Sequence, residues 1–259
     1  MRIKSPGHAA FAATMIFLGI LCLTKGDFSP IWAPVPKSVP AHKLLAYLCG
    51  FVSLLCGIGL LWQRTAAVAS RVLLAYFVLW LLLLRLAFVL PHPSLLGFWS
   101  CGETAVMTAG AWVLYVWFAG DQDKQRFGFA TGDTGLRIAR ALYGLSLIPF
   151  GLAHFVYLKE TVVLIPTWPS PVAWAYFTGG AFIAAGIAVI TGVWARVGAA
   201  LSALMMGLFT LIIWVPIVAK GPNAGQWNEF VVSCALTAAG WVVADSYRGI
   251  PWRAVRLNR

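Results

Sequence analysis

The chain has 259 residues, of which 61% are hydrophobic and 10% charged, and its formal net charge is +11. Soluble domains carry roughly 25% charged residues, so this composition excludes an ordinary water-soluble domain and favours a protein surrounded by lipid. The positive charges lie near the ends of apolar runs, where membrane topology explains them, and we therefore expect no nucleic-acid partner.

Eight apolar runs are each long enough to form a transmembrane helix. They cover His8–Thr24, Lys43–Trp62, Ala66–Leu90, Phe98–Gly120, Leu136–Tyr157, Pro171–Thr191, Ala195–Val218 and Trp227–Ala244. The first run lacks a convincing small-residue cleavage site, so we expect a retained helix and no cleaved signal peptide. Residues 121–135 form the longest charged stretch and are expected to be a cytoplasmic linker, and residues 248–259 a basic cytoplasmic tail.

Lysine and arginine are distributed unevenly between the two sides that these helices define. The side with the two chain ends holds 12 of them, and the opposite side holds 5. The positive-inside rule then places both ends in the cytoplasm. We expect a multi-pass protein of the bacterial inner (plasma) membrane, with the lipid bilayer as its surroundings.

Several features recur in the same order in the two halves of the chain. The sequence AYLCG (Ala46–Gly50) is matched by AYFTG (Ala175–Gly179), a WQR turn is matched by a WAR turn, and each half has Pro-rich outer loops, such as Ala33–Pro40. This order predicts a duplication, with halves at 1–120 and 136–247. Because each half has an even number of helices, both share one orientation. The predicted fold class is all-α, a polytopic membrane protein of two parallel four-helix bundle repeats.

The second half carries a set of motifs with a family resemblance. GLAHF (Gly151–Phe155), a Pro-rich segment, the spaced glycines Gly179 and Gly186, and GVWAR (Gly192–Arg196) resemble the DoxX-like and DoxD-like four-helix membrane proteins. The likeness covers roughly Arg137–Tyr247, and the first half matches more weakly. Similar proteins include a subunit of a thiosulfate:quinone oxidoreductase, while many have no assigned activity. The resemblance implies the fold and a quinone-linked oxidoreductase subunit.

Ionisable residues lie toward the outer ends of several helices, and such residues inside a membrane often mark a site. An outward-facing apolar pocket with a polar mouth would accept a quinone head group. We predict His154 and Glu229 as catalytic residues, the first for proton relay and the second for proton acceptance. The predicted cofactor-binding residues are Trp168, Trp227, Tyr176, Arg85 and Glu103.

The same residues also admit a purely structural interpretation. Arg85 would pair with Glu103, and His154 with Glu229, to pin helix ends together. The five cysteines contain no C-x-x-C pair and the four histidines no i, i+4 pair, so the sequence predicts no metal site. The cysteines are expected to pack as small apolar side chains.

Three hypotheses for the function follow. The first is an integral membrane subunit of an oxidoreductase or electron-transfer system, linked to quinone. The second is a non-catalytic accessory subunit of a larger membrane complex, and both hypotheses imply membrane-protein partner subunits. The third is a small-molecule transporter, which is weakened because charged groups are missing from the middle of the predicted helices.

Overall fold

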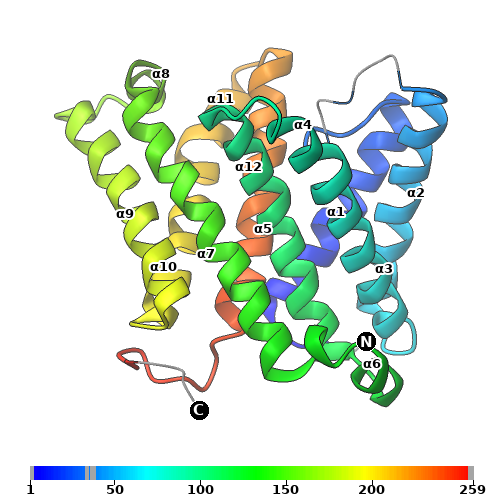
Figure 1. Ribbon diagram of the computed structural model, residues 1–259. Coiled ribbons are helices and arrows are strands. Elements are labelled where there is room, and N and C mark those ends of the chain that lie inside the picture. Colours follow the sequence, from blue (N-terminus) through cyan, green and yellow to red (C-terminus); the bar gives the residue numbers. More distant parts are fainter. Residues whose placement is uncertain (1–2, 33–34, 36–38, 256–259) are drawn as a thin grey trace.

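The computed structural model describes residues 3–32, 35 and 39–255 (Figure 1). Within these ranges the chain is helical, with a single isolated β-bridge between Val193 and Val255. The elements are α1 Pro6–Lys25, α2 His42–Leu61, α3 Ala66–Leu79, the π-helix η1 Trp80–Leu86, α4 Ala87–Val89, α5 Leu95–Phe118, α6 Asp121–Arg126, the 3-10 turn η2 Gly128–Ala130, α7 Gly132–Val156, α8 Leu158–Leu164, α9 Pro171–Thr191, α10 Ala195–Phe209, the π-helix η3 Thr210–Trp214, α11 Val215–Ala219 and α12 Ala224–Asp245.

Seven helices among the described residues are long and apolar enough to cross a membrane. They are α1, α2, α3 with its continuation to Val89, α7, α9, α10 with its continuation to Ala219, and α12. By length and composition they identify a multi-pass membrane protein. The remaining long helix, α5, has 24 residues but is not among the seven, since Glu103, Thr104 and Thr108 lower its hydropathy.

All eight predicted segments are helical, and their ends follow local sequence signals. Ser5 and Ser94 cap α1 and α5, because each side chain accepts a hydrogen bond from a backbone N–H of the first turn. Asn223 forms a capping box with Gln226 at the start of α12. The predicted outer loop Ala33–Pro40 lies mostly outside the described residues, as do residues 256–259 of the predicted tail.

The helices pack in the same order of neighbours in the two halves. In the first half α1 packs on α2, α2 on α3, and α3 on α5; in the second half α7 packs on α9, α9 on α10, and α10 on α12. The helices α5 and α12 contact each other in the middle of the bundle (Figure 1). We call the end of the bundle that holds α6 the inner end, and the end that holds α4, α8 and α11 the outer end.

Glycines allow the closest approaches within each half. A Cβ atom at Gly19 would lie 2.8 Å from the carbonyl oxygen of Gly50, and one at Gly151 would lie 2.4 Å from the carbonyl oxygen of Gly179. Neither distance is possible for a real Cβ atom, so only glycine permits this contact between α1 and α2 or between α7 and α9.

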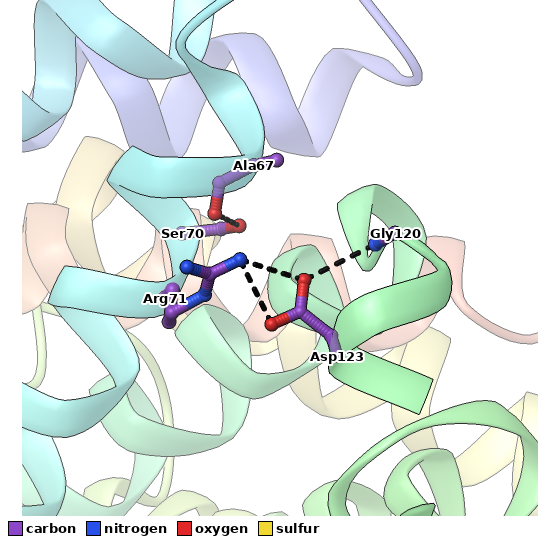
Figure 2. A network of polar contacts seen from close by, with 5 residues as sticks. All are labelled: Ala67, Ser70, Arg71, Gly120 and Asp123. Atoms are coloured by element: carbon purple, nitrogen blue, oxygen red, sulfur yellow. Dashed lines mark hydrogen bonds and ion pairs between the residues drawn. The ribbon is translucent and has the colours of Figure 1, made fainter. Parts of the chain in front are cut away.

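The segment predicted as a linker is folded and is held against α3 at the inner end. The Arg71 guanidinium lies 2.9 Å from the Asp123 carboxylate, which also accepts a hydrogen bond from the Gly120 N–H at 3.2 Å (Figure 2). Burial would raise the pKa of Asp123, but the hydrogen bonds from Arg71 and Gly120 and the charge of Arg71 together lower it. Arg71 therefore stabilises the linker through an ion pair.

The end of α12 and the start of α1 are joined at the same inner end. Asp245, which is buried, accepts a hydrogen bond from the Gly7 N–H at 2.9 Å and pairs with Arg248 at 2.8 Å. The Arg140 guanidinium lies 4.0 Å from the centre of the Tyr247 ring and donates hydrogen bonds to Ser246. Burial raises the pKa of Tyr247 to about 12. These contacts bind the segment after α12 to both halves.

Candidate functional site

His154 lies near the outer end of α7 with only 8% of its surface exposed. Its Nδ1 atom lies 2.8 Å from the carbonyl oxygen of Phe150. A carbonyl oxygen only accepts hydrogen bonds, so Nδ1 carries the proton. In the neutral ring Nε2 is then an acceptor, and no hydrogen bond to Nε2 is present among the described residues. The backbone thus fixes the tautomer that can receive a proton from a ligand.

Aromatic rings from three other helices surround the His154 imidazole. Trp99 of α5 is stacked nearly parallel to it, with ring centres 6.4 Å apart and an angle of 14° between the planes. Phe209 of α10 lies at 6.2 Å and Phe182 of α9 at 5.6 Å. These aromatic faces favour flat groups next to the imidazole.

Trp99 links the imidazole to a carboxylate. Its Nε1–H donates a hydrogen bond to Glu103 Oε1 at 2.7 Å, across one turn of α5. The Glu103 carboxylate also interacts electrostatically with Arg85 and with Glu229. His154, Trp99, Glu103 and Arg85 therefore form one continuous arrangement toward the outer end of the bundle.

Arg85 is held from several directions in the π-helix η1, and only 5% of its surface is exposed. Its Nε–H donates to Thr104 Oγ1 at 3.2 Å, and its Nη2–H donates to the carbonyl oxygen of Ile31 at 3.3 Å. The electrostatic attraction to Glu103 is added to these hydrogen bonds. Arg85 thus joins α5 to the turn that follows α1, next to the carboxylate.

The structure separates Glu229 and Trp227 from the core of this arrangement. Glu229 is exposed on the first turns of α12. It interacts with the arrangement through electrostatic repulsion of Glu103. Trp227 packs on Phe230, with ring centres 5.6 Å apart, and Lys25 Nζ lies 6.0 Å from the centre of its ring. Within the described part of the chain, neither residue forms a hydrogen bond or ring contact with His154, whose neighbours are backbone and aromatic rings.

Of the two other predicted cofactor-binding residues, Tyr176 lies in the outer part of α9 and Trp168 in the loop that precedes this helix. Tyr176 stacks on Phe155, with ring centres 5.6 Å apart, and Trp168 packs edge-on against Trp174 at 5.2 Å. Both side chains are exposed. They therefore present rings to the surroundings of the bundle, while His154 on the neighbouring helix is enclosed.

Trp99, Phe182 and Phe209 belong to the site but were absent from the predicted set. The spacing of Trp99 and Glu103, four residues apart on one predicted helix, was a usable signal, because such residues share a face. Phe182 and Phe209 carried no such signal, since any phenylalanine in an apolar helix resembles a packing residue.

The first half contains a second cluster, of aromatic rings, that was not predicted from the sequence. The rings of Trp32, Tyr76 and Trp80 contact one another, with centres 4.8, 5.1 and 5.7 Å apart. Five buried polar atoms of the described residues have no hydrogen-bond partner, and all five belong to this half: Ser29 Oγ, Trp32 Nε1, Ser53 Oγ, Tyr76 OH and Trp80 Nε1. The Tyr76 and Ser29 side chains nevertheless interact with the thiols of Cys49 and Cys22, whereas an indole N–H without an acceptor costs about 1–3 kcal/mol.

Metal and disulfide chemistry find no support in the described part of the chain. No group of three or more His, Cys, Asp or Glu side chains there is placed to hold a metal ion. The five cysteines are free thiols, and four of them are buried. Cys22 nevertheless has a polar role, because its sulfur accepts a hydrogen bond from the Ser29 N–H at 3.1 Å.

The fold and the composition define the class, a multi-pass helical membrane protein. No family model, no curated protein and no solved structure matches the chain. The resemblance to the DoxX-like proteins stays a prediction.

Proposed function

We propose that the chain is the integral membrane subunit of a quinone-linked oxidoreductase and binds the reduced head group, a quinol, beside His154. The observation that carries this proposal is the fixed tautomer of His154. Because Nδ1 donates to the carbonyl oxygen of Phe150, Nε2 can accept a hydrogen bond from the hydroxyl of a ligand. A quinol offers such hydroxyls on a flat ring, which suits the aromatic faces of Trp99 and Phe209.

We also propose eight membrane spans in two parallel repeats, with α5 as the fourth span. Gly50 and Gly179 are 129 positions apart and make equivalent close approaches. Gly110 and Ala239 are also 129 positions apart, and a Cβ atom at Gly110 would lie 3.1 Å from the Ala239 Cβ. Residues beside a two-fold axis contact their own counterparts, so this contact supports an axis between α5 and α12.

The orientation that we propose places the inner end of the bundle in the cytoplasm of a bacterial cell. The excess of lysine and arginine at that end supports this choice. The His154 site then faces the outer leaflet of the plasma membrane. A head group would enter from the lipid.

In the proposed reaction, the bound quinol supplies the redox chemistry and its two electrons pass to a partner subunit. His154 Nε2 accepts one hydroxyl proton, because Nδ1 is already protonated and donates to Phe150. The Glu103 carboxylate, oriented by Trp99, accepts the second proton. Arg85 attracts that carboxylate electrostatically.

Binding of a short-chain quinol to the purified protein under anaerobic conditions tests the proposal. We expect His154→Ala to weaken binding by roughly tenfold or more, as loss of a hydrogen bond to an ionisable group implies. His42→Ala is the matched control, because His42 lies at the outer end beside Asp27 and outside the site. Equal affinities for the wild type and His154→Ala would overturn the proposal.

The hypothesis of an accessory subunit makes a different prediction in the same experiment. An accessory subunit would co-purify with a membrane partner in mild detergent, as the oxidoreductase subunit would, but it would not bind the quinol. Binding and co-purification are therefore measured on the same preparation.

A further inference from the structure

We propose that a cavity at the inner end of the bundle binds the phosphate group of an anionic phospholipid. Three segments form the cavity: the residues before α1, the end of α5, and the end of α12 with the residues that follow it. Its lining residues are Lys4, Ser5, Trp117, Asp245, Ser246 and Arg248. None of them belongs to the His154 site, so this inference goes beyond the proposed function.

The cavity is large enough for a head group. Its volume is about 280 Å³, whereas one water molecule needs only about 10–15 Å³. It therefore has room for a group of several heavy atoms, such as a phosphate with part of its glycerol ester. The cavity is also partly open to its surroundings, so a ligand can enter without displacing a helix.

Positive charge exceeds negative charge around this cavity. Lys4 and Arg248 are exposed cations in the lining, and the buried Arg140 guanidinium of α7 donates hydrogen bonds to a lining serine. Asp245 is the one acid among the described lining residues. Asp133, which is exposed and outside the lining, offsets part of the Arg140 charge. An anion would balance the excess that remains.

The Asp245 carboxylate is already occupied by donors of the protein. Its Oδ2 atom accepts a hydrogen bond from the Gly7 N–H at 2.9 Å, and its Oδ1 atom lies 2.8 Å from Arg248 Nη2. Only 7% of the Asp245 surface is exposed. Because burial and these donors shield the carboxylate, the exposed part of the lining is cationic.

Lys4 and Trp117 supply donors that the protein itself leaves unused. Lys4 Nζ lies 5.7 Å from the centre of the Phe118 ring. Within the described residues it forms no ion pair, and Trp117 Nε1 donates no hydrogen bond. The backbone holds Lys4 in place, because its N–H donates to His8 Nδ1 at 3.1 Å. An ammonium group and an indole N–H can each bind a phosphate oxygen.

The surroundings of the cavity favour a lipid over free phosphate. Ile3, next to Lys4, is exposed, and so is Trp241, one turn before Asp245 on α12. Exposed apolar and indole side chains at the ends of membrane helices contact lipid. In the orientation proposed above, the cavity lies at the inner leaflet, where anionic head groups attract lysine and arginine.

The test measures binding of dioctanoyl phosphatidylglycerol to the full-length protein in a non-ionic detergent, by calorimetric titration and by thermal stabilisation. Lys4→Gln removes the charge and keeps the backbone N–H that bonds to His8. We expect it to weaken binding by roughly fivefold, the effect of one lysine near an anionic head group. Trp117→Phe keeps a ring but removes the donor, and should weaken binding by roughly three- to tenfold.

Arg64→Gln is the matched control. Arg64 is an exposed cation in the turn between α2 and α3, at the same end of the bundle, and it does not line the cavity. This variant should bind the lipid like the wild type. Without lipid, Lys4→Gln and Arg64→Gln should also melt like the wild type, because neither side chain has an ion pair to lose within the described residues.

Two further ligands identify the source of the phosphate. Dioctanoyl phosphatidylcholine has the same phosphate and acyl chains without the net negative charge, and it should bind more weakly than phosphatidylglycerol. Inorganic phosphate lacks the acyl chains and should give no stabilisation at the same concentration. If inorganic phosphate binds as tightly as phosphatidylglycerol, the cavity takes free phosphate and the assignment to a lipid is wrong.

The variants decide whether the cavity is the site. If Lys4→Gln and Trp117→Phe both bind phosphatidylglycerol as tightly as the wild type, the inference is wrong. It is also wrong if Arg64→Gln weakens binding as much as Lys4→Gln, because the attraction is then a general effect of surface charge. A wild type that binds no phosphatidylglycerol overturns it as well. Quinol binding beside His154 is a separate measurement, so either proposal can fail without the other.

Discussion

The position of Cys22 in the first half and that of His154 in the second half have similar frames and different chemistry. In both, a glycine three residues earlier packs against a glycine on the next helix, Gly19 against Gly50 and Gly151 against Gly179. Around His154 lie aromatic faces and, through Trp99, a carboxylate, whereas Cys22 accepts a hydrogen bond from the Ser29 N–H. A small set of glycine contacts fixes the backbone and leaves the enclosed side chains free to diverge.

The largest effect that we expect comes from those glycine contacts. Gly19→Ala and Gly151→Ala should each lower the free energy of unfolding by about 3 kcal/mol, because each added Cβ atom would overlap a backbone atom of the next helix. Thermal unfolding in detergent is the measurement. Gly180→Ala, whose Cβ atom meets nothing within 4 Å, should be neutral or slightly stabilising. If only one of the two substitutions lowers the stability strongly, the glycine contacts do not play the same part in the two halves.

Asp245 holds the two halves together at the inner end, and we expect its loss to have the next largest effect. Asp245→Ala leaves the Gly7 N–H and the Arg248 guanidinium without their partner and should cost about 2 kcal/mol. The control is Asp121→Ala, because the Asp121 side chain is 92% exposed. If both variants unfold at the same temperature, Asp245 does not join the halves energetically.

Asp123 should have a smaller, pH-dependent effect. Its pKa is lowered in the folded protein, so the ion pair with Arg71 stabilises the protein above the pKa of an unfolded aspartate, near 3.8, and this stabilisation is lost as the pH falls through the lower folded value. Asp123→Asn should cost about 1 kcal/mol near neutral pH, since Arg71 is half exposed. The difference from the wild type should shrink in acid; a difference that stays constant with pH would contradict the ion-pair explanation.

The sequence predicted the helices well because apolar runs and caps are local. Pro171–Thr191 was predicted to the residue, and α1, α2 and α12 differ from their predicted ends by at most a few positions. The π-helices η1 and η3 were not predicted, because their hydrogen-bond shift leaves no pattern in composition.

The candidate site was predicted only in part, because its geometry depends on contacts between helices. Sequence patterns located His154 and Glu103 but also placed Glu229 with them, whereas Glu229 is exposed on the first turns of α12. The unpaired donors of Trp32 and Trp80 could not be foreseen, since an unpaired group is recognised only after its neighbours are known.

The hydrogen bond from the Gly7 N–H to Asp245 has a consequence for how the protein is made. The first helix emerges from the ribosome long before the residue that accepts this bond is synthesised. During insertion, the Gly7 N–H therefore lacks this acceptor until α12 has been synthesised. The contact between the start of α1 and the end of α12 can form only after all the helices between them have been made.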